Sequence, residues 1–241
     1  MHIFKSLLLI SMISLLTACF GSSGGGGGND DDGGGGGTSP NPDAEFRIFP
    51  VGYFNDGYRE EFEVEGSNVL GNYEGTLVKS TQDQTTFNGN NVIPVRTFSH
   101  WWSVLNPLDD VELIEDEYFS LTENDRQRLG YVFLTFAISA FPSSTTAIPV
   151  KAKVGESGDI GTYTDSVGET REVSWELEAG DNDGEAKLTF NHTRKFSDDS
   201  IHIIHEFTYV IDEDGNRKSI AISHDDQHLG LLTTWEGTLK E

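Results

Sequence analysis

The chain has 241 residues, of which 16 are lysine or arginine and 40 are aspartate or glutamate, giving a formal net charge of −24. A surface this acidic repels phosphate backbones and anionic headgroups, so we exclude nucleic-acid binding and charge-driven docking on anionic lipid. The single cysteine excludes an internal disulfide, so the folded part depends on packing alone. Aromatic residues make up 11% of the chain, which is ample for a hydrophobic core.

The first 18 residues have the features of an export signal. Lys5 supplies a positive charge before an apolar stretch, residues 7–16, which is short for a bilayer span and typical of a signal peptide. The stretch ends in four residues that resemble the lipobox of bacterial lipoproteins: Leu16-Thr17-Ala18-Cys19. The resemblance implies cleavage by signal peptidase II between Ala18 and Cys19, a diacylglyceryl group on the Cys19 thiol, and a further acyl chain such as palmitate on the new amine. Two or three acyl chains anchor a protein stably, whereas one chain does not.

The residue after the lipobox cysteine bears on the membrane that is reached. In Gram-negative lipoproteins an aspartate at this position tends to retain the protein at the inner membrane, and here the residue is Phe20. The resemblance therefore implies an exported, lipid-anchored protein at a Gram-negative outer membrane, on its periplasmic or its surface face.

Residues 19–44 join the anchor to the rest of the chain. They contain two runs of five glycines around an Asn-Asp-Asp-Asp segment and lack an apolar face, so we expect a disordered tether. A glycine-rich coil of this length has a root-mean-square reach of roughly 25–30 Å. Such a spacer would let a folded domain stand clear of the membrane.

From residue 45 to residue 241 the pattern predicts one β-rich domain. Val173, Trp175 and Leu177 alternate with polar residues, and residues 201–211 alternate in the same way. Asp-Gly turn signals separate such runs, so residues 160–239 read as an antiparallel meander with one buried face. Residues 46–100 show a similar pattern.

The middle of the chain allows more than one interpretation. Thr122 begins a capping-box pattern that predicts a short helix, and the apolar segment Tyr131 to Phe141 fits a buried strand or a buried helix. Tyr73-Glu74-Gly75-Thr76-Leu77 resembles Trp235-Glu236-Gly237-Thr238-Leu239, which fits either two related lobes (45–105 and 145–241) or a chance likeness.

No catalytic motif is present, and we expect no cofactor. Gly155-Glu156-Ser157-Gly158-Asp159 departs from the nucleophile elbow, and His205-Glu206 lacks the second histidine of a zinc protease motif. His205 lies on the apolar face of its predicted strand, which favours a core histidine. The densest set of metal-ligand residue types is His224, Asp226 and His228, but a solvated turn is the better interpretation because no further ligand is identified by spacing.

Two pairs of aromatic residues are candidates for ligand binding: Trp101, Trp102, Tyr53 and Phe54. Adjacent residues of a strand point to opposite faces, so one tryptophan of the first pair is expected to face outward, where a sugar could stack on it. The alternative is that both rings are covered.

These observations predict a mainly β, antiparallel fold, as a sandwich or an open barrel, with at most one or two short helices. The leading functional hypothesis is a non-catalytic envelope lipoprotein that binds a protein or glycan partner and contacts the membrane through its acyl chains. One alternative is a carrier of a lipid or small apolar ligand. The other is a hydrolase with dispersed carboxylates, which requires two acids in unlike environments.

Overall fold

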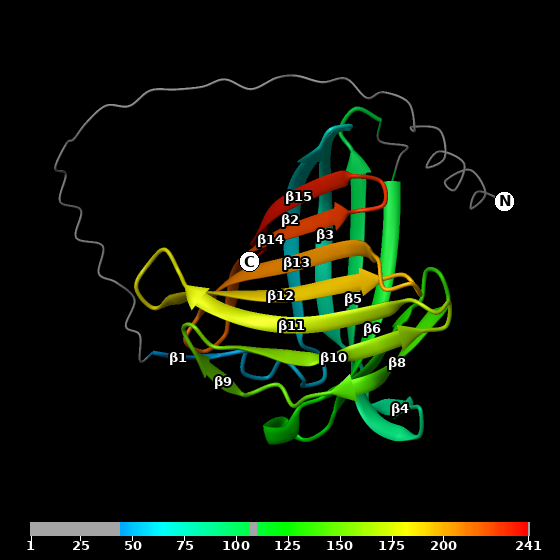
Figure 1. Ribbon diagram of the computed structural model, residues 1–241. Helices are drawn as coiled ribbons and strands as arrows, with labels where there is room; N and C mark the ends of the chain where they lie inside the picture. Colours follow the sequence, from blue (N-terminus) through cyan, green and yellow to red (C-terminus); the bar gives the residue numbers. More distant parts are fainter. Residues whose placement is uncertain (1–43, 107–109, 241) are drawn as a thin grey trace. The chain divides into compact units, whose positions relative to one another are not determined.

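The computed structural model describes residues 44–106 and 110–240 (Figure 1). These residues form strands joined by short connections, and one 3-10 turn, η1 (Glu123–Asp125). Among them, no helix is long and apolar enough to cross a membrane. The strands are β1 (Glu45–Arg47), β2 (Arg59–Asn68), β3 (Gly71–Thr81), β4 (Thr85–Phe87), β5 (Asn90–Ser103), β6 (Asp110–Ser120), β7 (Arg128–Phe133), β8 (Ile138–Thr145), β9 (Lys151–Lys153), β10 (Ser157–Asp165), β11 (Thr170–Ala179), β12 (Glu185–Lys195), β13 (Ile201–Asp212), β14 (Arg217–Asp226) and β15 (Leu231–Leu239).

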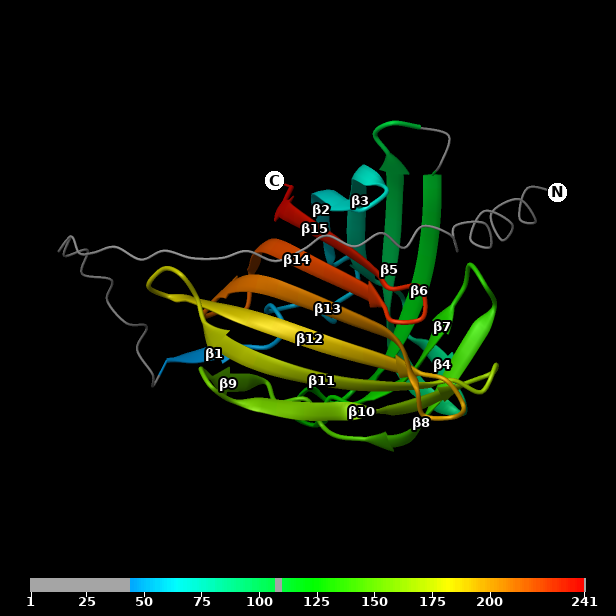
Figure 2. The same ribbon diagram turned by 45° about the horizontal axis from the view of Figure 1, so that its top comes forward.

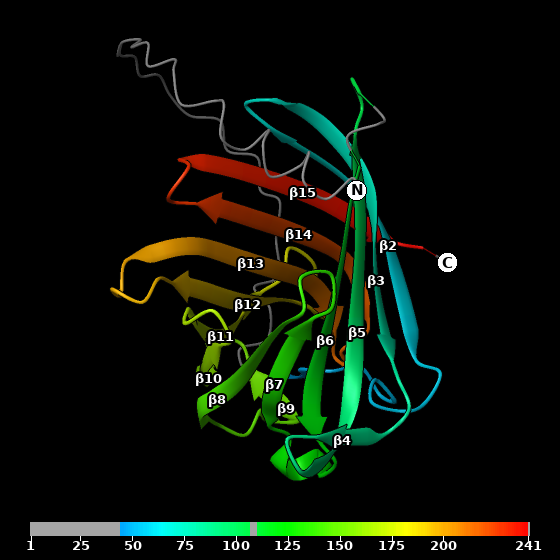
Figure 3. The same ribbon diagram turned by 90° about the vertical axis from the view of Figure 1, so that its right-hand side faces the viewer.

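Twelve of the described strands form a closed antiparallel barrel (Figures 1 and 3). Strands that follow one another in the chain are neighbours, β15 pairs with β2, and β3 pairs with β5 to complete the ring. β4 adds to β5 outside the ring, and β1 pairs with β9 separately. Closure leaves few free backbone groups at sheet edges, which limits edge-to-edge aggregation.

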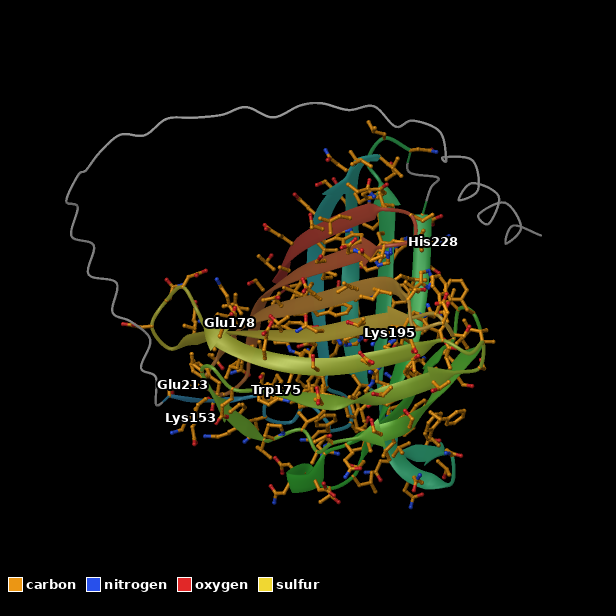
Figure 4. The ribbon with its side chains drawn as sticks, viewed as in Figure 1. Lys153, Trp175, Glu178, Lys195, Glu213 and His228 are labelled. Atoms are coloured by element: carbon orange, nitrogen blue, oxygen red, sulfur yellow. The ribbon has the colours of Figure 1, made fainter. Side chains whose placement is uncertain are left out.

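Consecutive antiparallel strands turn back alternately at the two ends of the barrel (Figure 2). The two ends differ in the segments that lie at them. One end holds the connections β2–β3, β5–β6, β7–β8, β10–β11, β12–β13 and β14–β15, and we call it the hairpin end. β1, β9 and residues 48–58 lie at the other, which we call the capped end. Figure 4 shows Lys195 and His228 toward the hairpin end, and Lys153, Glu178 and Glu213 toward the capped end.

The hydrophobic core lies inside the barrel toward the capped end. The chain from β1 to residue 58, which we call the covering segment, buries Phe46, Ile48 and Tyr53. They pack together with inward residues of the barrel strands, such as Leu188 and Tyr209. The covering segment is tied to the barrel, because the Thr81 hydroxyl donates to the Tyr53 carbonyl and the Arg47 amide donates to the Glu213 carbonyl. Burial of these aromatic side chains is the main contribution to stability at this end.

The prediction of a mainly β, antiparallel domain is confirmed, and the sheet closes into a barrel instead of stacking as a sandwich. Residues 160–239 form the predicted meander, β10 to β15. The segment 131–141 is neither one strand nor a helix, because it contains the second half of β7, a turn and the first half of β8. The short helix expected after Thr122 is a single 3-10 turn, and the Thr122 side chain makes no capping hydrogen bond. Both predicted lobes contribute strands to one continuous sheet.

Candidate functional site

The barrel interior contains a cluster of charged side chains from strands that are distant in the sequence. Arg128 of β7 binds two carboxylates of β6, with 3.2 Å from Nη2 to Glu115 Oε1 and 2.9 Å from Nε to Glu117 Oε1. Arg171 of β11 donates to the same Glu115 oxygen at 2.8 Å. Lys79 of β3 lies 3.9 Å from Glu117 Oε2. Glu115 therefore bridges two arginines, and the cluster links four strands around the ring.

Aromatic rings surround the two arginines of this cluster. The Arg171 guanidinium lies 4.0 Å from the centre of the Tyr131 ring, and that of Arg128 lies 4.8 Å from the centre of the Tyr163 ring. Both side chains are buried, so these cation–π contacts act in a medium where electrostatic attraction is strong. The arginines are held in place by ion pairs and by aromatic faces together.

Glu117, one of the two carboxylates of the cluster, is held in its ionised form, which is the wrong protonation state for a general acid. Burial by itself would raise the pKa of the Glu117 carboxyl, but the positive charges of Arg128 and Lys79 outweigh burial and lower this pKa. A general acid at neutral pH needs a raised pKa. Glu117 therefore does not support the hydrolase alternative.

A second buried ion pair lies nearer the capped end. Arg217 of β14 donates to Glu60 of β2, and both side chains are almost completely buried. The Arg217 guanidinium lies 4.1 Å from the centre of the Tyr209 ring and 4.9 Å from that of Tyr53. Tyr53, predicted as a ligand-binding aromatic, is thus a core residue that packs on a buried cation.

A cavity of about 80 Å³ lies between the two groups of charges. Its wall includes the charged residues Lys79, Glu115, Glu117, Arg128, Arg171 and Arg217 together with the apolar residues Phe119, Phe190 and Phe207. Ligand pockets for drug-sized molecules measure roughly 300–1,000 Å³. This interior cavity is therefore too small for a lipid. A larger hollow along β2, β3 and β15 is open and has Glu63, Glu65 and Glu236 in its wall, which does not favour an apolar ligand.

Three histidines lie on the inner face of adjacent strands near this cavity. His192 pairs in register with His205, and His205 pairs with His224, with which it shares a hydrogen bond between Nε2 and Nδ1. Burial lowers the pKa of all three, and the charges of Arg128 and Arg171 lower that of His192 further. These imidazoles are therefore neutral at pH 7, and His205 is a hydrogen-bonded interior histidine, as its position in the sequence indicates.

Two tryptophans stack inside the barrel between the cavity and the hairpin end. The rings of Trp101 (β5) and Trp235 (β15) have their centres 5.2 Å apart at an interplanar angle of 28°. The stack requires glycine on the neighbouring strands, because a Cβ at Gly66 would lie 2.2 Å from Cδ1 of Trp235 and one at Gly75 would lie 2.4 Å from the His100 carbonyl oxygen. Trp101 is thus an interior residue.

The other predicted aromatics lie elsewhere. Trp102 points to the outside of the barrel, where its ring centre is 5.2 Å from that of His100. Phe54 lies at the capped end with the Arg126 guanidinium 4.1 Å from its ring centre. The four predicted aromatics therefore do not form a single binding surface.

The predicted metal-ligand residues are also separated. His224 lies inside the barrel beside His205, Asp226 accepts a hydrogen bond from the Leu229 amide, and His228 is exposed with its ring against Phe196. Among the described residues, no group of three or more histidine, cysteine, aspartate or glutamate side chains is arranged to hold a metal ion.

The hairpin end is apolar at its surface. Five of its six connections expose at least one large apolar side chain, and at the sixth, β12–β13, the exposed apolar residue is Ile201, the first residue of β13. These residues, which we call the apolar tips, are Val69, Leu70, Val104, Leu105, Leu134, Phe136, Val167, Ile201 and Leu229. At the capped end, the connections β11–β12 and β13–β14 carry Asp181, Asp183, Glu213 and Asp214, and the exposed apolar residues are fewer, Val51 and Leu121 among them. Exposed apolar groups gathered on one part of a surface mark interaction sites more often than scattered ones do.

Sequence reasoning missed both the interior charge cluster and the apolar tips. A local signal for the tips exists, because Val69-Leu70 stands in a two-residue turn where glycine, asparagine or aspartate is usual. The charged cluster has no comparable signal, since an inward-facing charge in an alternating strand reads as a polar outward residue. Ala18 and Cys19, the predicted cleavage and lipidation sites, lie outside the described residues.

Comparison of this chain with protein-family models, with curated proteins and with solved structures found no match.

Proposed function

We propose that this protein is a membrane-tethered, non-catalytic binding module whose hairpin end contacts a protein partner. The observation that carries the proposal is the set of apolar tips, which places exposed aliphatic or aromatic side chains on or next to all six connections at one end of the barrel. Such residues cost solubility when they stay in water, and burying them against a partner returns roughly 25 cal/mol for each Å² of apolar surface.

A protein fits this surface better than a glycan or a bilayer. Sugars stack on aromatic rings, whereas eight of the nine apolar tips are aliphatic and only Phe136 is aromatic. Peripheral membrane binding to anionic lipid draws on lysine and arginine, and the net charge of −24 opposes it. The apolar tips therefore favour a protein partner that has an apolar patch on its own surface.

The proposed lipid anchor leaves the hairpin end available to a partner. The chain enters the barrel through β1, which lies at the capped end with β9. Acyl chains on Cys19 would therefore pull on the capped end through the preceding segment, and the hairpin end would be free to face away from the membrane. The proposed site of anchoring is a Gram-negative outer membrane, as the lipobox resemblance implies.

The test compares two double variants that add the same charge at opposite ends of the barrel. Val69→Asp with Leu229→Asp changes two apolar tips, which are 88% and 51% exposed. Val51→Asp with Leu121→Asp changes a valine and a leucine at the capped end, which are 66% and 40% exposed. Each acylated full-length protein is crosslinked in its native envelope, the captured partner is identified by mass spectrometry, and its affinity is then measured with purified components.

The hairpin-end variant is expected to lose at least tenfold in affinity for the captured partner, while the capped-end variant binds like the unchanged protein. Equal affinity of both variants would refute the proposal. Vesicles of neutral lipid, mixed with the unacylated Cys19→Ser chain, provide the competing outcome. Vesicle binding that the hairpin-end variant abolishes would assign the apolar tips to a bilayer instead.

A further inference from the structure

We propose that the cavity inside the barrel binds a small organic monoanion of the carboxylate class, held by Lys79, Arg128 and Arg171. This site is separate from the apolar tips and does not depend on the partner proposed above. The inference rests on the balance of charge in the cavity wall, on donors without acceptors, and on the shape of the cavity.

The wall of the cavity has more positive than negative charge. Four of its residues are cations (Lys79, Arg128, Arg171 and Arg217) and two are carboxylates, Glu115 and Glu117. Arg217 is paired with Glu60, so three cations remain for two carboxylates. An uncompensated buried charge is costly, and one bound monoanion neutralises the set.

A further buried carboxylate, Asp165, lies outside the cavity wall. One oxygen of Asp165 accepts hydrogen bonds from the amides of Val167 and Glu169, and the other lies 3.2 Å from Nη2 of Arg194. Asp165 therefore closes the β10–β11 turn and shares Arg194 with Glu169. Asp165 is not a residue of the cavity wall, in which three cations remain for two carboxylates.

Three buried donors on residues of this wall have no acceptor among the described protein atoms: Arg128 Nη1, Arg217 Nε and the Tyr209 hydroxyl. All three residues are nearly inaccessible to solvent. Burial raises the pKa of Tyr209, so its hydroxyl keeps its proton and remains a donor. Buried donors almost always have partners in folded proteins, and an oxygen anion is an acceptor that arginine binds with particular strength.

The cavity also indicates which anion fits. Its volume of about 80 Å³ accommodates only a few non-hydrogen atoms. Phe119, Phe190 and Phe207 give it an apolar side, which suits the methyl or ethyl group of a short carboxylate better than the fully polar surface of phosphate or sulfate. A single excess positive charge likewise matches a monoanion.

The hairpin side of the cavity wall is the less buried side. His192, His205 and Phe207 on that side keep some exposure, whereas Tyr53 and Tyr209 on the capped side are fully buried. The neutral imidazoles of His192 and His205 present N–H groups without adding charge. A small solute would approach the cavity from this side, past the stacked rings of Trp101 and Trp235.

The experiment measures acetate and propionate binding to the full-length protein by isothermal titration calorimetry, with chloride and sulfate as comparison anions. Lys79→Met removes the excess positive charge and leaves both pairs of Arg128 in place, so affinity is expected to fall at least tenfold. Glu117→Gln adds one positive charge to the wall, so affinity is expected to rise at least threefold. Lys187→Met is the matched control, because Lys187 is on the outer face, paired with Asp181, and affinity should not change.

Opposite effects of Lys79→Met and Glu117→Gln support the inference, and circular dichroism verifies that each variant is folded. If Lys79→Met does not fold, the rise expected for Glu117→Gln still decides the matter. The inference is overturned if neither carboxylate binds, if sulfate or chloride binds as tightly as propionate, or if both variants have the affinity of the unchanged protein.

Discussion

The neutral histidines inside the barrel make the stability of this protein depend on pH in a predictable way. His192 and His205 have lowered pKa values in the folded state, because burial disfavours the charged imidazolium and nearby cations repel it. In the unfolded chain they return to the ordinary value of 6.5. Below pH 6.5 the unfolded chain therefore binds protons that the folded barrel does not, and the free energy of unfolding decreases as the pH falls.

The size of the effect follows from the same linkage. A histidine that stays fully neutral when folded and titrates at 6.5 when unfolded costs about 1.4 kcal/mol at pH 5.5 and less than about 0.1 kcal/mol at pH 7.5. For the two histidines together the upper limit of the loss between these values is therefore about 2.7 kcal/mol. That is a large fraction of the stability of a typical domain, which is about 5–15 kcal/mol.

The assay is urea unfolding, followed by circular dichroism at pH 7.5, 6.5 and 5.5 in buffers without carboxylates and at constant chloride. The unchanged protein is compared with the double variant His192→Gln with His205→Gln, whose amides do not titrate. As the pH falls from 7.5 to 5.5, the free energy of unfolding of the unchanged protein should decrease by up to about 2–3 kcal/mol more than that of the variant. Curves that run parallel over this interval would show that the two imidazoles are not held neutral by the barrel.

Three further predictions concern the anchor, the core and metal ions. Cys19→Ala should release the protein from membranes and remove the acyl mass from its amino terminus, as fractionation and mass spectrometry will show; continued membrane retention counts against the anchor. Trp175→Ala should cost roughly 3–5 kcal/mol in urea unfolding, because Trp175 is 5% exposed and lies over Gly158 of β10, whereas Val167→Ala at an exposed turn should cost about 0.5 kcal/mol or less. A Trp175 cost under about 1 kcal/mol contradicts the inward assignment of that residue. Added chelator should leave the melting temperature unchanged, and a drop of many degrees in calorimetry would restore the metal-site interpretation.

The strands of the second half of the chain could be predicted because their pattern is local. Val173, Trp175 and Leu177 alternate with polar residues, and in the barrel all three point inward and are buried. Asp214-Gly215 stands at the tight turn between β13 and β14, where Gly215 has a φ of +79°. Segment 131–141 was harder, because it joins parts of two short strands and its apolar residues do not follow one period.

The candidate sites could not be predicted in this way. Lys79, Glu117 and Arg128 read as ordinary polar positions of three separate strands, and they meet only because β3, β5, β6 and β7 are neighbours in a closed ring. The apolar tips show the same limitation, since Val69 and Leu229 are 160 residues apart in the sequence and share one end of the barrel only through its meander.

The sequence by itself determined the export and lipidation features as expectations, the class of fold, and the inward direction of apolar strand residues such as Val173, Trp175 and Leu177, because these depend on spacing over a few residues. The tertiary structure decided that the sheet closes, that a cation-rich cavity lies inside it, and that the apolar turns gather at the end opposite β1. These properties arise from strand pairing between distant parts of the chain, which is set by the packing of the whole domain and not by any local pattern of residues.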